Sequence, residues 1–239
     1  MRIDLIDEEG LIHILQGDLT LKVSLDNVRK NYERDNDESY ISDLVNTLVS
    51  YTTEVPVNWI EAKDAIYISL FPNDYEFNDF LHSRMSDEFS KVYVHSDQDK
   101  LTWITADDLV QWNITLLELD EQANSNADKL LEKAEIASDI IENHRLGRIE
   151  TEYATLKGAL LFAPAMKNKV RDDFGFPYYA VLPVRDFCYI FSENDFDFFA
   201  QRIGKVVVDE YKQSGYPITT EILKFTDDGV EAVGKYPVE

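Results

Sequence analysis

Two stretches of the sequence each predict a β-hairpin followed directly by a helix. The first is VYVHSDQDKLTWIT with a helix beginning at ADDLVQW, and the second is YAVLPVRDFCYIFS with a helix beginning at ENDFDFF. Alternating apolar residues are typical of strands. Thr105 and Ser192 are each expected at a helix N-cap position, and acidic residues follow each of them in the first helical turn. Strands joined by a short turn must pair antiparallel. We therefore expect an α+β fold with antiparallel or mixed sheets and helices packed on one face.

The elements around these hairpins predict a tandem β-α-β-β-α repeat. AIYISLFP (65–72) and GALLFAP (158–164) are each expected to form a strand that ends at a proline. FNDFLHSRM and MKNKVRDDF are each expected to form the helix that follows. The two copies share few identical residues, so chance similarity within an ordinary α+β protein is the alternative.

Both capped helices carry apolar residues at three- or four-residue spacing, which places them on one helix face. We expect these residues to anchor the core. They are Leu109, Trp112 and Leu116 in the first copy and Phe196, Phe199, Ile203 and Val207 in the second.

The remaining segments complete a division into three parts. Residues 1–60 hold N-terminal strands and two helices, for which Ser24 or Asp26 and then Ser39 are the expected caps. Residues 61–135 hold the first α+β copy and a polar helix over 113–133. Residues 136–239 hold a linking hairpin, the second copy and a C-terminal hairpin. The alternative is that all three parts form one compact domain.

The charge of the chain restricts its partners. The sequence has 46 acidic side chains and 23 lysines and arginines, a net charge of −23. Such a protein repels phosphate backbones and anionic lipids, so we expect no nucleic acid and no membrane partner. Residues 1–150 hold 32 acidic and 13 basic side chains, whereas residues 151–239 hold 14 and 10. A protein partner, if there is one, would have a basic surface; simple solubility is the alternative.

Cys188 is the single cysteine, which excludes an internal disulfide and a cysteine zinc cluster. No apolar run approaches the ~20 residues that a membrane span needs. The first residues lack the basic and apolar parts of a signal peptide. We therefore expect a soluble, cytoplasmic protein.

The motifs of common enzymes are missing from the sequence. There is no G-x-G-x-x-G, no P-loop, no G-x-S-x-G and no H-E-x-x-H, and the four histidines lie far apart. Cys188 lies in an apolar strand and is expected to be a small buried hydrophobe. We predict no catalytic residue, no metal ligand and no cofactor, and we expect only shallow grooves.

The segment RDDFGFPYYAVLPVRDF (171–187) combines aromatic rings, prolines and charges, the residue types that binding hot spots use. Its plain structural interpretation is a helix-to-strand loop and a hairpin turn with half-buried tyrosines. The candidate interaction residues are Arg171, Phe174, Phe176, Tyr178, Tyr179, Arg185 and Asp186.

Three segments carry a resemblance to a known family. VYVHSDQDKLTWITADDLVQWNI, YAVLPVRDFCYIF and the closing YPITTEILKFTDDGVEAV resemble elements of the YtpQ-like bacterial proteins of unknown function, over roughly residues 60–235. The sequence departs from the family in two ways. The helix predicted after the first hairpin continues with Leu116, Leu117, Glu118 and Leu119, where the family has an Asn-Leu pair. The N-terminal part of this chain is also shorter than that of typical family members. The resemblance implies a cytosolic bacterial protein with a housekeeping or accessory role. The family has no agreed activity, so the resemblance provides no catalytic residues to carry over.

The sequence favours a non-enzymatic protein-binding or adaptor module. One alternative is an acidic inhibitor or immunity-type protein that masks a basic partner. A second is a hydrolase or transferase with an unrecognised carboxylate site. The oligomeric state is open.

Overall fold

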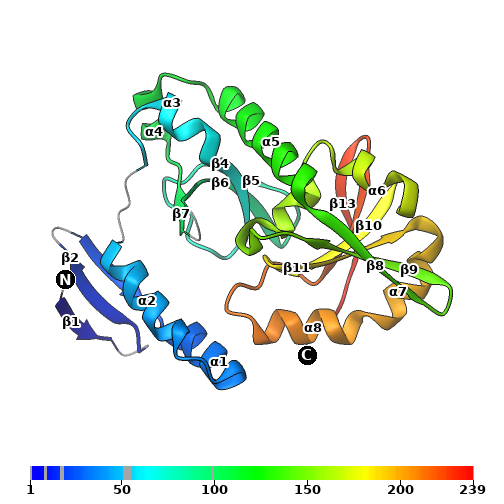
Figure 1. Cartoon of the computed structure of the whole chain (residues 1–239), viewed down its shortest axis with the longest axis horizontal. Helices are drawn as coiled ribbons and strands as arrows, with labels where there is room; N and C mark the ends of the chain where they lie inside the picture. The colour runs from blue at the N-terminus through cyan, green and yellow to red at the C-terminus, as the bar shows by residue number, and fades with distance from the viewer. Residues whose placement is uncertain (1, 8–9, 17–18, 51–54, 98–99, 239) are drawn as a thin grey trace. The chain divides into compact units, whose positions relative to one another are not determined.

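The computed structural model describes residues 2–7, 10–16, 19–50, 55–97 and 100–238. The chain divides into two compact units, Met1–Thr53 and Glu54–Glu239 (Figure 1). Three antiparallel sheets with helices make the class α+β, as the hairpin pattern predicts.

The first unit is a three-stranded meander followed by two helices. Its strands are β1 (Arg2–Ile6), β2 (Ile12–Gln16) and β3 (Leu19–Val23), and its helices are α1 (Asp26–Asp35) and α2 (Ser39–Ser50). The expected cap of α1 is wrong, because Leu25 occupies the N-cap position and provides no side-chain cap. Ser39 is the first residue of α2, and its backbone N–H donates to Asp37 Oδ1 at 2.8 Å.

A four-stranded sheet begins the second unit. It contains β4 (Ile66–Pro72), β5 (His82–Arg84), β6 (Phe89–Asp97) and β7 (Lys100–Trp103), and β6 pairs with the other three. The helix expected over FNDFLHSRM is wrong, since this segment holds turns and β5. Asn78 adopts a positive φ of 45°, and the N–H of Leu81 donates to the carbonyl of Ile104. Backbone hydrogen bonds to neighbouring strands thus replace the intrahelical hydrogen bonds of a short helix, which would be only marginally stable by itself.

Helix α3 (Trp59–Ala62) precedes this sheet in the chain and continues into the 3₁₀ turn η1 (Lys63–Ala65). Helices α4 (Ala106–Trp112) and α5 (Leu116–Lys133) follow the sheet. Thr105 caps α4 in a reciprocal capping box with Asp108, which confirms the expected cap. Trp112 is buried, but the expected stripe does not reach Leu116, which is 48% exposed. Asn113 adopts the left-handed conformation and ends α4, so Leu116 begins the next helix.

A six-stranded sheet completes the unit, with the strand order β13-β12-β10-β11-β9-β8. The predicted hairpins are present. Their strands are β8 (Glu135–Ile141), β9 (His144–Glu150), β10 (Tyr178–Val184), β11 (Phe187–Ser192), β12 (Glu221–Thr226) and β13 (Gly229–Lys235). The linking hairpin β8–β9 forms one edge, and the C-terminal hairpin β12–β13 forms the other.

The strand expected over 158–164 is wrong. This segment forms the 3₁₀ helix η3 (Gly158–Phe162), which follows η2 (Ala154–Leu156) and precedes α6 (Met166–Phe174). A short buried apolar run has no periodicity that separates a strand from a buried helical turn. The two proposed copies therefore differ in element order, with β5 replacing a helix in the first and η3 replacing a strand in the second. The tandem repeat is not confirmed.

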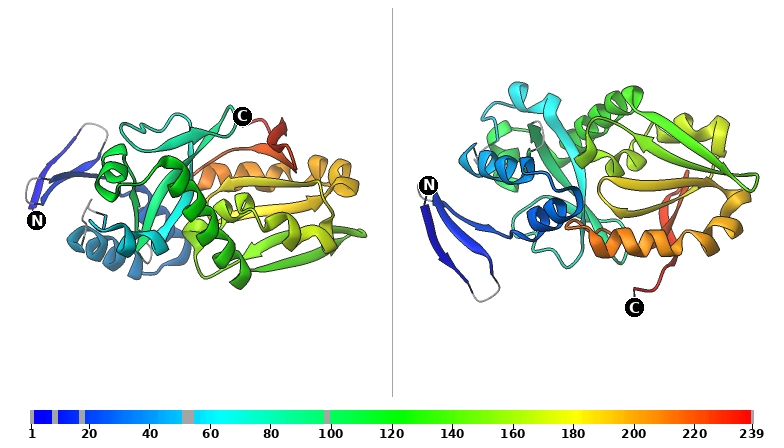
Figure 2. Two further views of the ribbon diagram at one scale, coloured as in Figure 1. Left: turned by 90° about the horizontal axis from the view of Figure 1, so that it is seen from above. Right: turned by 60° about the horizontal axis from the view of Figure 1, so that its bottom comes forward.

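Helices cover both faces of the six-stranded sheet, rather than the single face expected. Tyr178 and Ala180 of β10 share one core with residues of α5 and α6. Tyr179 and Val181 share a second core with α7 (Phe196–Arg202) and α8 (Gly204–Gln213), which follow the short η4 (Glu193–Asp195). Figure 2 shows the orange helices and the green helix α5 on opposite sides of the yellow strands. All seven residues of β10 are buried, as a central strand covered on both faces requires.

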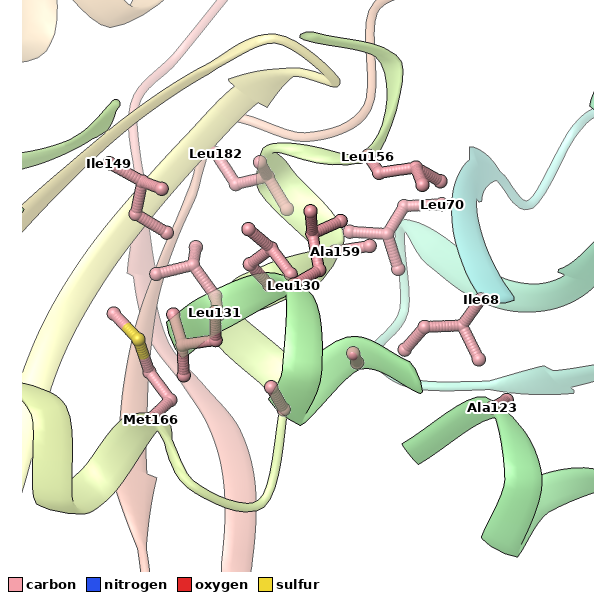
Figure 3. Packing of buried hydrophobic residues seen from close by; sticks show 14 of the residues in the cluster. Ile68, Leu70, Ala123, Leu130, Leu131, Ile149, Leu156, Ala159, Met166 and Leu182 are labelled. Carbon is pink, nitrogen blue, oxygen red and sulfur yellow. The ribbon is translucent and has the colours of Figure 1, made fainter. Parts of the chain in front are cut away.

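The larger core joins the two sheets of the second unit. Figure 3 shows Leu130 and Leu131 of α5 in one cluster with Ile68 and Leu70 of β4 and with Leu182 of β10. The smaller core contains the predicted residues Phe199, Ile203 and Val207, with Phe196 packed against it.

Phe199→Ala should lower the free energy of unfolding by about 3–5 kcal/mol, because it leaves a cavity in the smaller core. Val206→Ala on α8 is the control, since Val206 is 41% exposed and should change stability by less than about 0.5 kcal/mol. Urea unfolding of both variants measures the difference. Equal losses would contradict the packing described.

Gly158→Ala should lower the free energy of unfolding by about 1–3 kcal/mol. A Cβ there would lie 2.9 Å from the carbonyl oxygen of Arg185 and would also meet Leu182. Gly234→Ala in β13 is the matched control, because its nearest atom would be the Ile222 side chain at 3.8 Å. Thermal melting should separate the two variants, and a neutral Gly158→Ala would show that η3 can move away from the β10–β11 turn.

Candidate functional site

An open pocket of about 320 Å³ lies beside the larger core of the second unit. We call it the apolar groove. Four stretches of chain meet there: β4 to β6, α5, the segment from η3 to α6, and the strands β10, β12 and β13. Its lining residues are Ile68, Met85, Lys91, Asn124, Leu161, Phe162, Ala163, Pro164, Met166, Lys167, Phe176, Tyr178, Phe225, Thr226 and Val230.

Stacked aromatic rings form the floor of the apolar groove. Tyr178 and Phe225 lie on neighbouring strands with ring centroids 4.7 Å apart and planes 6° from parallel. Phe162 lies against Phe225 at 5.4 Å, and Phe176 lies 6.2 Å from Tyr178. The Tyr178 hydroxyl donates to the carbonyl of Leu161 at 3.1 Å, so its polar atom is satisfied inside the fold. Burial raises the pKa of Tyr178, which keeps the phenol neutral.

The polar end of the apolar groove contains Lys91 and Asn124, which both bind the neighbouring Asp120 of α5. Lys91 donates to Asp120 Oδ1 at 2.6 Å, and the Tyr93 hydroxyl donates to the same oxygen. Asn124, one helical turn beyond Asp120, donates to Oδ2 at 2.9 Å. This carboxylate therefore ties β6 to α5 through two donors, Lys91 and Tyr93, while Asn124 holds it from within α5.

The electrostatics of this cluster favour a fixed charge. Burial alone would raise the pKa of Asp120, but the hydrogen bonds from Lys91, Tyr93 and Asn124, with the charge of Lys91, lower it below the ordinary 3.8. Burial and the bond to Asp120 raise the pKa of Tyr93. Neither group is suited to exchange protons near neutral pH, where a general acid or base needs its pKa. The cluster is better suited to holding the end of the groove in place.

The candidate interaction residues do not form one surface. Phe176 and Tyr178 line the apolar groove. Tyr179, the next residue of β10, lies on the opposite face against Phe196. Successive side chains of a strand point to opposite faces, so the two tyrosines cannot meet a common ligand.

The other four candidates are also separate. Phe174 is buried against Gly147, where an added Cβ would clash with its ring. Arg171 and Asp186 are exposed, on α6 and in the β10–β11 turn. Arg185 lies in the same turn against Phe71 and Tyr216.

Sequence reasoning missed most of the groove. Lys91 and Asp120 are separated by 29 residues, and Met85 lies in the segment expected to be helical. The only local signal is the four-residue spacing of Asp120 and Asn124 on a predicted helix, which is common on ordinary helix surfaces.

Other chemically capable side chains are engaged structurally. His144 Nδ1 lies 2.7 Å from Asp195 Oδ1, and its ring stacks on Phe198 at 3.8 Å. Burial raises the pKa of the Cys188 thiol to about 11, which agrees with the expectation of a buried hydrophobe. Within the described residues, no group of three or more histidine, cysteine, aspartate or glutamate side chains is placed to bind a metal ion.

A second carboxylate cluster connects the two sheets. Glu221 is 4% exposed, and its Oε2 accepts from Ser86 at 2.5 Å and from Thr219 at 3.1 Å. The Thr219 hydroxyl also lies 3.1 Å from Glu88 Oε2. These bonds join the start of β12 to the segment before β6, which is a structural role.

Searches of family models, curated proteins and solved structures found no match to this chain. The resemblance to YtpQ-like proteins therefore stays a prediction. Among the described residues, none of the helices combines the length and the apolar character needed to cross a membrane.

Asp120→Asn should lower the free energy of unfolding at pH 7 by about 1 kcal/mol, because solvent screens this partly exposed pair. The pKa of Asp120 is lower in the folded protein than in the unfolded chain, so the ionised carboxylate stabilises the fold. This stabilisation is fully present above the unfolded-state pKa and is lost as the pH falls through the folded-state pKa. The difference between wild type and variant should therefore shrink from about pH 5 to about pH 3.5. Urea unfolding across this range measures it.

Asp172→Asn serves as the control, because Asp172 is exposed on α6. It should leave stability nearly unchanged at each pH. If Asp120→Asn lowered the free energy of unfolding by the same amount at every pH, the loss would come from poor packing of the new amide and not from the missing carboxylate charge.

Proposed function

We propose that this chain is a protein-binding module whose apolar groove receives an apolar segment of a partner protein. The observation that carries the proposal is the lining of the groove, in which eleven of fifteen residues are apolar or aromatic. Apolar concave surfaces with a few fixed polar groups are typical of binding sites.

The shape and chemistry of the groove support a peptide segment over a small reactive substrate. The rim residues Met85, Phe162, Phe176 and Val230 are only partly buried, so they can still lose water to a partner. Met85 and Met166 are flexible side chains of the kind that adaptable binding surfaces use. The carboxylate next to the polar end, Asp120, is held by three donors and has a lowered pKa, which does not suit proton transfer.

The charge of the chain bears on the partner. With a net charge of −23, the molecule attracts basic proteins and repels acidic ones. Asp228 is exposed in the turn between Thr226 and Val230, two residues of the groove, whereas Asp227 beside it pairs with Lys167 at 3.2 Å. We expect the apolar segment of the partner to be flanked by lysine or arginine, with binding that weakens as salt increases.

A random-peptide display library screened against the full chain tests this function. Enriched peptides should carry large apolar residues flanked by basic ones. Val230→Glu and Met85→Glu should each weaken the binding of an enriched peptide at least about tenfold, because the partner would then bury a charge. Fluorescence polarisation with the labelled peptide measures the affinity.

Val233→Glu is the matched control, since Val233 lies on the same strand β13, is exposed and is not part of the groove lining. It should bind as the wild type does. A library that enriches no sequence would contradict the function, and peptides that bind all three variants equally would contradict the site.

A further inference from the structure

Arg185 occupies the turn between β10 and β11, and its guanidinium lies against two aromatic rings. Its Cζ is 4.8 Å from the ring centroid of Phe71 and 4.1 Å from that of Tyr216. Phe71 is buried near the end of β4, whereas Tyr216 is 55% exposed between α8 and β12. Rings from two distant parts of the chain thus hold one cation.

The hydrogen-bonding capacity of this guanidinium is unused inside the protein. A guanidinium has five N–H donors and no acceptor. In the part of the chain that the structure describes, no hydrogen bond or ion pair joins the Arg185 side chain to another residue. The Arg185 side chain is partly buried, and this burial lowers its pKa. Stacking satisfies the faces of the guanidinium, but the donors on its edge need an acceptor.

Other arginines of this chain have carboxylate partners. Arg148, for example, donates to Glu150 at 2.7 Å and also to Asp139. The same holds for Arg84 with Asp87, Arg145 with Asp173 and Arg202 with Glu142. The exposed Asp186 follows Arg185 in the turn and acts on it only through space. Arg185 is therefore more buried than a solvated surface arginine and lacks the carboxylate partner that these four arginines have.

We propose that Arg185 anchors a binding site for an oxoanion, the carboxylate or phosphate group of a ligand. A planar guanidinium presents two parallel N–H groups that match two oxygens of such a group. The rings of Phe71 and Tyr216 fix the orientation of the guanidinium, and exposed Tyr216 adds an apolar surface for the rest of the ligand. Residues 151–239 carry 14 acidic and 10 basic side chains, so the local repulsion of an anion is weaker than in the first part of the chain.

This site is separate from the apolar groove, because none of Arg185, Phe71 and Tyr216 lines it. The proposal therefore does not depend on the peptide-binding function. It also gives a role to Arg185, a candidate interaction residue that lies outside the groove.

Titration of the full chain, followed by NMR at the arginine Nε–H resonances, tests the proposal. Inorganic phosphate and glutarate are the probes, each added against chloride at constant ionic strength. The Arg185 resonance, identified by its loss in Arg185→Lys, should shift in a saturable manner with at least one oxoanion. Phosphate alone would indicate a phosphate-bearing ligand, and glutarate a carboxylate.

The variants separate a bound anion from a general salt effect. Arg185→Lys keeps the charge but loses the bidentate fork, so the affinity reported by the Tyr216 backbone amide should fall at least about tenfold. Arg148→Lys is the matched control and should leave that affinity unchanged. The proposal is overturned if neither probe gives a saturable shift at the wild-type Arg185 resonance, or if Arg148 responds in the same way. The wild-type titration is decisive even where Arg185→Lys alters the fold.

Discussion

The burial of β10 on both faces is the constraint on which the second unit depends. Its residues alternate between two cores, so Tyr178 and Ala180 pack toward α5 and α6 while Tyr179 and Val181 pack toward α7 and α8. A strand in this position has no solvent-exposed face to carry polar residues. Apolar residues must therefore cover both faces of β10, which explains why helices pack on both faces of the sheet.

The same strand positions both proposed binding sites. The Tyr178 ring stacks on Phe225 and forms part of the floor of the apolar groove. The turn that follows the other end of β10 holds Arg185 against Phe71 and Tyr216. A rigid, fully buried strand fixes both ends, and sites on rigid elements keep their geometry more exactly than sites on long loops. The groove would take apolar side chains and the Arg185 site an anionic group, so a single partner with both features is compatible with the structure.

Local signals in the sequence predicted many elements correctly. The N-cap at Thr105 was correct, and Ser192 caps the 3₁₀ turn η4 that leads into α7. Both caps were predictable because a cap depends only on residues three positions apart, and in both cases the side chain accepts the expected backbone N–H. The hairpins were correct because alternating apolar residues around a short turn have few other solutions. The seven candidate interaction residues fared differently: only Phe176 and Tyr178 belong to the groove, since strand alternation and burial separate the others.

By itself, the amino-acid sequence determined the α+β class, the hairpins, the caps at Thr105 and Ser192, the buried cysteine and the acidic character. All of these depend on composition or on residues a few positions apart. The tertiary structure alone decided that 77–85 forms turns and a strand, that 158–162 forms a 3₁₀ helix, and that Asp120 meets Lys91. It also decided that Arg185 lies between Phe71 and Tyr216. These features depend on contacts between residues that are distant in the chain. A short apolar run or a single charged residue can have many partners, and its partner is decided only when the sheets pack together.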